Sequence, residues 1–85
     1  MKRILVAEDE AAIREFIVIN LKRNGYDVTD TENGEKALEA YYAEGGAFDI
    51  VLLDIMMPGI DGLEVCKQIR QHICFPKCLY IRNHG

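Results

Sequence analysis

Residues 48–62 read FDIVLLDIMMPGIDG, and this stretch decides the fold. Its first six residues form the most strand-like run in the chain, and a continuous apolar run of this length is typical of a strand covered on both faces. Asp54 closes the run, Pro58 and Gly59 give a turn signal, and a helix is predicted to begin near Asp61. A strand that ends in a carboxylate and leads through a turn into a helix is the unit around which the rest of the chain is arranged.

The same unit occurs twice before it. Residues 3–7 are a short apolar strand ending in acidic residues, and residues 26–30 form a weaker strand. The first is followed by an amphipathic helix that Asn24 and Gly25 end, and the second by a helix that Asn33 caps and Gly45 and Gly46 end. The apolar positions expected on the inner faces of the three helices are Ile13, Phe16, Ile17 and Leu21; Ala37, Leu38 and Tyr41; and Leu63, Cys66, Ile69 and Ile73.

Three strand–helix units in succession predict an α/β protein in which helices cover both faces of a parallel sheet, giving three layers. We expect the strand order 2-1-3, or 2-1-3-4 if residues 79–81 add a short fourth strand. In this order the chain reverses direction about the first strand, and a crevice opens at the carboxyl ends of strands one and three. Glu8, Asp9 and Asp54 are predicted to meet there.

Three carboxylates in one crevice repel each other unless a cation neutralises them. Mg²⁺ suits such a site, because it prefers oxygen ligands and keeps several of its waters. An aspartate beside the ion can act as a nucleophile toward phosphorus, and Asp54 is the best placed of the three. The alternative is that Glu8 and Asp9 only belong to the acidic start of a helix, and that Asp54 only ends a strand.

Composition excludes several classes of protein. The chain has 85 residues, a net charge of −4 and 49% hydrophobic residues, but no apolar run long enough to span a bilayer and no signal-like start, so we expect a soluble cytoplasmic protein. Its three cysteines are expected to be thiols. All 14 acidic residues lie in residues 1–64, which argues against direct nucleic-acid binding.

Two motifs resemble the receiver domains of bacterial response regulators, which are the phosphoacceptor modules of two-component signalling. They are residues 2–10, KRILVAEDE, and residues 48–62, and the similarity is visible over residues 2 to about 71. The resemblance implies a flavodoxin-like sheet, with Asp54 as the phosphoacceptor and Glu8 and Asp9 as the acidic pair of the Mg²⁺ site. It also implies that the backbone carbonyl of Met56 is a metal ligand and that a sensor histidine kinase donates the phosphoryl group.

The tail departs from this family. We divide the chain into residues 1–71, the N-terminal part of a receiver, and residues 72–85, an atypical tail. The family places a Ser or Thr at the end of its fourth strand, where this chain has Arg82, Asn83 and His84, and a Lys on a fifth strand that would lie beyond residue 85. We therefore expect a receiver cut short and impaired in phosphotransfer, acting as a signalling module and not as an enzyme.

Three other interpretations remain open. The chain could be a non-phosphorylatable interaction module that competes for a kinase or a partner regulator. It could also bind zinc through tail residues, although their spacing is weak and packing of small apolar side chains explains them better. Finally, an exposed strand edge or the uncovered first helix could lead to self-association. The zinc candidates are Cys66, His72, Cys74, Cys78 and His84.

Overall fold

The computed structural model describes residues 2–55, 57–71 and 77–81. The chain alternates strands and helices, as the sequence predicts. The elements are β1 (Arg3–Ala7), α1 (Ala11–Arg23), β2 (Asp27–Thr31), α2 (Gly34–Ala43), β3 (Ile50–Asp54), α3 (Gly62–Ile69) and β4 (Lys77–Ile81). In the described part of the chain no helix is long and apolar enough to cross a membrane.

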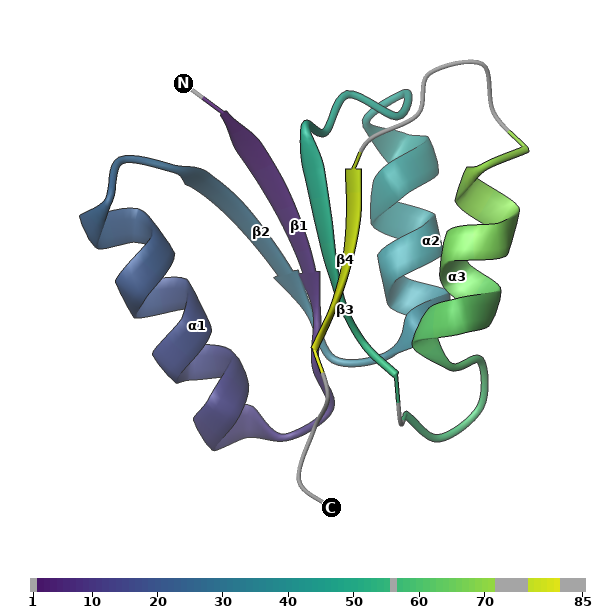
Figure 1. Ribbon diagram of the computed structural model, residues 1–85, viewed down its shortest axis with the longest axis horizontal. Helices are drawn as coiled ribbons and strands as arrows, with labels where there is room; N and C mark the ends of the chain where they lie inside the picture. The colour runs from purple at the N-terminus through teal and green to yellow at the C-terminus, as the bar shows by residue number, and fades with distance from the viewer. Residues whose placement is uncertain (1, 56, 72–76, 82–85) are drawn as a thin grey trace.

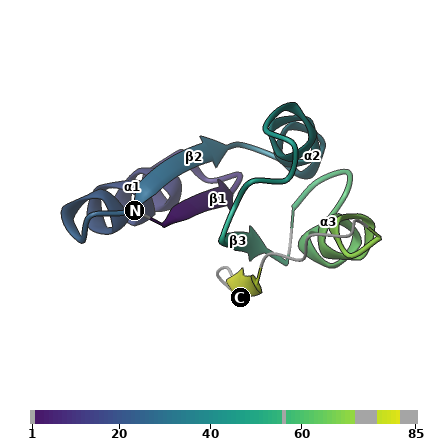
Figure 2. The ribbon, with the colours of Figure 1, turned by 90° about the horizontal axis from the view of Figure 1, so that it is seen from above.

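The strands form one parallel sheet in the order β2-β1-β3-β4. The predicted order 2-1-3-4 is therefore confirmed, with the tail residues Lys77–Ile81 as the fourth strand beside β3. Helix α1 covers one face of the sheet, and α2 and α3 cover the other (Figures 1 and 2). The chain is thus a three-layer parallel α/β domain in which the first strand is central and the direction of winding changes at β1.

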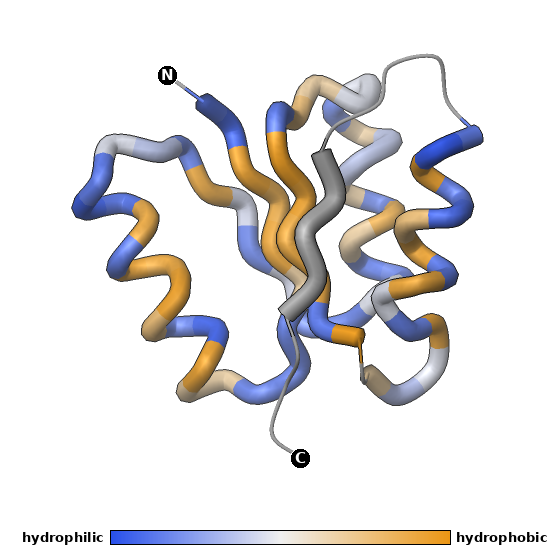
Figure 3. Tube along the Cα trace, in the orientation of Figure 1, coloured by the Kyte–Doolittle hydropathy of each residue, from blue (hydrophilic) through white to orange (hydrophobic). Residues whose placement is uncertain are grey.

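The main core lies between the sheet and the α2–α3 layer. Alternate residues of the central strands, such as Leu5 and Leu53, point into it, and Tyr41 and Ile69 meet them from the helices. Figure 3 shows the apolar runs of β1 and β3 side by side in the middle of the molecule. Burying strands on both faces requires such continuous apolar runs, which is why residues 3–7 and 50–53 are the clearest strand signals in the sequence.

The inner face of α3 differs by one position from the prediction. Cys66 and Ile69 are buried as expected, but Leu63 is 54% exposed and Val65 takes the core position. A helix places residues three or four apart on one face, so Gly62, Val65, Cys66 and Ile69 form the true inner stripe. Ile73, the last predicted member of the stripe, lies outside the described residues.

Helix α1 has no fully buried residue. Ile13, Ile17 and Leu21 are half-buried, which fits their predicted position, whereas Phe16 is 67% and Ile19 is 50% exposed. Expecting Phe16 to share the inner face was wrong, because its place on the helix turns it away from the sheet. The helix therefore has apolar residues on two sides and uses only one of them for packing within the domain.

Arg3 compensates the acidic residues at the amino end of the sheet. Its guanidinium donates a 2.7 Å hydrogen bond to Glu44, lies 3.5 Å from Asp27, and stacks 4.8 Å from the ring centroid of Phe48. The hydrogen bond to Glu44 raises the pKa of Arg3 above its ordinary value. Charges at this end of the sheet are thus paired locally, in contrast to the cluster of acids at the opposite end.

Candidate metal and phosphoacceptor site

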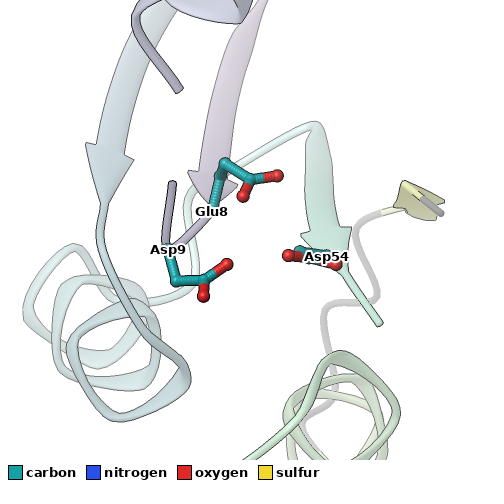
Figure 4. A group of neighbouring side chains, drawn as sticks. All are labelled: Glu8, Asp9 and Asp54. Atoms are coloured by element: carbon teal, nitrogen blue, oxygen red, sulfur yellow. The ribbon is translucent and has the colours of Figure 1, made fainter. Parts of the chain in front are cut away.

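The three predicted carboxylates meet at the carboxyl end of the sheet. Ala7 of β1 is in register with Leu53 of β3, so Glu8 and Asp54, the next residues along each strand, lie side by side. One carboxylate oxygen from each of Glu8, Asp9 and Asp54 lies within 4.8 Å of the others. Figure 4 shows the three side chains converging on one point.

The acids differ in their exposure. Glu8 and Asp54 are fully buried, whereas Asp9 is partly exposed. The Glu10 amide donates a 3.0 Å hydrogen bond to Glu8 Oε2, which orients that carboxylate. Among the described residues, Asp9 Oδ1 is shielded from solvent and has no hydrogen-bond partner. A buried carboxylate oxygen without a partner costs free energy, and a bound cation would offset that cost.

The end of β2 and the start of α1 hold the backbone of the acidic pair. The Glu8 amide donates to the Thr31 carbonyl at 3.1 Å, and Thr31 Oγ1 donates to the Val6 carbonyl at 2.8 Å. Arg14 Nη1 donates to the Glu8 carbonyl at 2.8 Å, and its Nε lies 3.6 Å from Asp30 Oδ2. Arg14 and Thr31 were not predicted from the sequence as part of the site. Arg14 could have been suspected from its position, because it is a charged residue next to Ile13 on the face of α1 that turns toward the sheet.

The loop between β3 and α3 completes the site. Asp61 caps α3 by accepting a 2.9 Å hydrogen bond from the Glu64 amide. A Cβ atom on Gly62 would overlap the carbonyl oxygen of Asp54, so only glycine allows the helix to begin this close to the end of the strand. Met56, whose carbonyl is predicted to be a metal ligand, lies outside the described residues.

The donor set fits magnesium. All three side chains offer hard carboxylate oxygens, which Mg²⁺ prefers, and the unpartnered oxygen of Asp9 is available to it. Among the described residues, one group of three or more His, Cys, Asp or Glu side chains lies close enough to share an ion, and it consists of these three acids. Cys66, one of the zinc candidates, is a buried free cysteine in the core, and the other zinc candidates have no described side chains.

Fold and site together define a parallel α/β domain with a cluster of three carboxylates where the carboxyl ends of β1 and β3 meet. The sequence matches the response regulator receiver domain family over residues 4–84. The chain belongs to this family, and the match continues past residue 71 into β4. The proposed division of the chain at residue 71 stays a prediction.

Relatives and solved structures agree with this assignment. The alkaline phosphatase synthesis transcriptional regulatory protein PhoP of Bacillus subtilis is 47% identical over 76 residues, which is 88% of this chain. A structure of the response regulator TrrA of Thermotoga maritima in complex with Mg²⁺-BeF is 51% identical, with a TM-score of 0.77 over 84% of this chain. A complex of the histidine kinase ThkA with TrrA matches all of this chain, at 44% identity and a TM-score of 0.87.

These relatives are longer than the present chain. It spans 31% of the length of PhoP, 60% of the TrrA chain and 72% of the chain matched in the kinase complex. The match to PhoP is thus confined to a receiver-sized part of a larger regulator.

Proposed function

We propose that this chain is a phosphoacceptor signalling module of a two-component phosphorelay, in which Asp54 accepts a phosphoryl group from the phosphohistidine of a sensor histidine kinase. Glu8, Asp9, Asp54 and the backbone carbonyl of Met56 would hold Mg²⁺ for this reaction. The main support is the approach of three carboxylates to within 4.8 Å at the carboxyl ends of two adjacent strands. The structure of the relative TrrA in complex with Mg²⁺-BeF adds to this support.

In the proposed reaction a carboxylate oxygen of Asp54 attacks phosphorus and forms an acyl phosphate. The phosphorus–nitrogen bond of the phosphohistidine breaks, the nitrogen keeps the electron pair, and the imidazole takes up a proton. When bound, Mg²⁺ supplies charge neutralisation at the phosphoryl oxygens. Burial of Asp54 and its place at the end of β3 hold the nucleophile in a fixed position.

The histidine kinase is the proposed partner. TrrA forms a complex with the kinase ThkA. In this chain, α1 starts directly after the acidic pair and exposes Phe16 and Ile19 on the side that faces away from the sheet. These two residues offer an apolar surface to a partner on the helix that follows the acidic pair.

Phosphoryl labelling tests the proposal. The chain is incubated with Mg²⁺ and either acetyl phosphate or an autophosphorylated histidine kinase, and intact mass and acid–base stability identify an acyl phosphate. We expect slow labelling confined to Asp54, because Arg82, Asn83 and His84 stand where the family has a hydroxyl. Asp54→Asn should remove the label. Asp49→Asn is the matched control, since Asp49 precedes the same strand at its opposite end, and its label should equal the wild type. Equal labelling of Asp54→Asn would refute the assignment.

The exposed apolar side of α1 also favours a second candidate function. The chain could bind a kinase or a partner regulator without accepting phosphate and compete with complete receivers. In that case Asp54→Asn would compete for the kinase as well as the wild type does, no acyl phosphate would form, and Phe16→Glu would abolish competition. Labelling of Asp54 together with weaker competition by Asp54→Asn would instead support the phosphoacceptor function.

A further inference from the structure

Arg14 connects three parts of the chain next to the acidic cluster. It lies in the first turn of α1, donates through Nη1 to the Glu8 carbonyl at 2.8 Å, and faces Asp30 of β2 through Nε at 3.6 Å. The planar guanidinium can hold two partners at once in a fixed geometry, which an ammonium group cannot do. Arg14 therefore links the backbone between the two acids of the site to the carboxyl end of β2.

The two contacts differ in strength. The hydrogen bond to the Glu8 carbonyl is partly buried, whereas the Asp30 side chain is about half exposed. Two surface cavities of about 180 and 240 Å³ border both Arg14 and Asp30, so water reaches the ion pair and weakens it. The bond to Glu8 is thus the main anchor, and Asp30 serves to aim the guanidinium.

The peptide that Arg14 holds is the one that joins Glu8 to Asp9. The Glu8 amide is fixed by Thr31 on the other side, so this residue is held at both its N–H and its C=O group. A rotation of this peptide would turn the Asp9 side chain away from Glu8 and Asp54. Groups that orient metal ligands without touching the ion commonly change metal affinity by about 10- to 100-fold when they are lost.

We propose that Arg14, aimed by Asp30, is a positioning residue that sets the orientation of Glu8 and Asp9 for Mg²⁺ and thereby couples the end of β2 to the metal site. This inference rests on the proposed metal site. It assigns a role to a residue that neither binds the ion nor takes part in phosphoryl transfer.

The sign of the effect on Mg²⁺ affinity separates positioning from simple charge. Arg14 is a cation near a cation site, so its removal should strengthen Mg²⁺ binding if only electrostatic repulsion mattered. If Arg14 positions the acids, its removal should weaken binding in spite of the lost repulsion. Arg14→Lys keeps the positive charge but loses the planar guanidinium that contacts two partners at once, so any loss of Mg²⁺ affinity in that variant reflects geometry.

The experiment is a Mg²⁺ titration followed by amide NMR shifts on the full chain. We expect Arg14→Ala to weaken binding about tenfold, Arg14→Lys to fall between Arg14→Ala and the wild type, and Asp30→Asn to weaken binding less than either. Arg23→Ala is the matched control, since it removes the same charge from the exposed last turn of the same helix, and should bind as the wild type does. In the metal-free chain, the Arg14 variants and, to a smaller extent, Asp30→Asn should shift the amide signals of residues 8–10, and Arg23→Ala should leave them unchanged.

Several outcomes would overturn the inference. Equal or tighter binding by Arg14→Ala would show that Arg14 acts only through its charge, and wild-type affinity in Arg14→Lys would exclude the bridging role. If Arg14→Ala does not fold, Arg14→Lys and Asp30→Asn decide the question. A wild-type chain that ignores Mg²⁺ would overturn the inference together with the metal site. Failure to label Asp54 in a chain that binds Mg²⁺ would count against the proposed function alone.

Discussion

Gly62 controls how closely α3 approaches the phosphoacceptor candidate. It is buried at the first position of the helix, and the space that a Cβ would need is taken by the carbonyl of Asp54 and the side chain of Leu53. Gly45, in contrast, has a positive φ of 62° and nothing within 4 Å of the place where its Cβ would lie. One glycine is required by contact and the other by backbone conformation.

Replacing these two glycines with alanine should separate stability from metal binding. Gly62→Ala should destabilise the fold by about 1–3 kcal/mol through overpacking and should weaken Mg²⁺ binding, because the end of β3 must shift. Gly45→Ala should cost about 1–2 kcal/mol for its left-handed conformation and leave Mg²⁺ affinity unchanged. Urea unfolding and Mg²⁺ titration measure the two effects. Unchanged Mg²⁺ affinity in Gly62→Ala would mean that α3 does not set the position of Asp54.

Helices α1 and α3 use their apolar residues differently. Ile69 is fully buried against the α2–α3 core, whereas Phe16, a larger side chain, is 67% exposed. Hydrophobic stabilisation follows the area removed from water and not the size of the residue. The two residues should therefore differ sharply when they are truncated.

Ile69→Ala should lower the free energy of unfolding by about 2–5 kcal/mol, since it leaves a cavity in the core. Phe16→Ala should change it by less than about 0.5 kcal/mol, as expected for an exposed position. Thermal or urea unfolding of the two variants gives both values. A loss of several kcal/mol in Phe16→Ala would show that α1 packs its outer side against another part of the chain or against a second copy.

The same contrast explains how much of the fold the sequence could predict. Strands β1 and β3 were predictable, because interior strands of a parallel sheet favour the unbroken apolar runs found at residues 4–7 and 50–53. Asn33 and Asp61 were readable as helix starts from their side-chain chemistry. The inner faces were less certain, because a spacing of three or four residues fits two adjacent stripes, and the tertiary contacts decide between Leu63 and Val65.

The three acids of the candidate site were predictable, because their positions depend only on where β1 and β3 end. Glu8, Asp9 and Asp54 follow directly from the strand order, and they do lie together. The supporting contacts were not predictable, because Arg14 and Thr31 reach the Glu8 backbone across elements that are distant in sequence. Such contacts depend on the register between β1 and β2 and on the angle of α1, which no local pattern specifies.

One side of the sheet is less covered than the other. Helix α1 contacts β2 and β1, while Ile50 and Leu52 of β3 alternate away from the α2–α3 core and stay partly exposed. β4 is the edge strand next to β3, and no other described strand pairs with its free edge. An unpaired parallel edge beside an apolar surface is a template for pairing with a second chain. We therefore propose self-association through β4 instead of through α1.

Sedimentation equilibrium from micromolar to millimolar concentration tests this proposal. We expect the average mass to rise with concentration toward that of a dimer, because joining two β4 edges satisfies the backbone hydrogen-bonding groups along that edge. Phe16→Glu places a charge on the exposed side of α1, which separates the two routes. If the β4 edge is the interface, this variant should associate as strongly as the wild type, and the β4 amides should become protected from hydrogen exchange as the dimer forms. A monomer throughout the concentration range, or loss of the dimer in Phe16→Glu, would contradict association through β4.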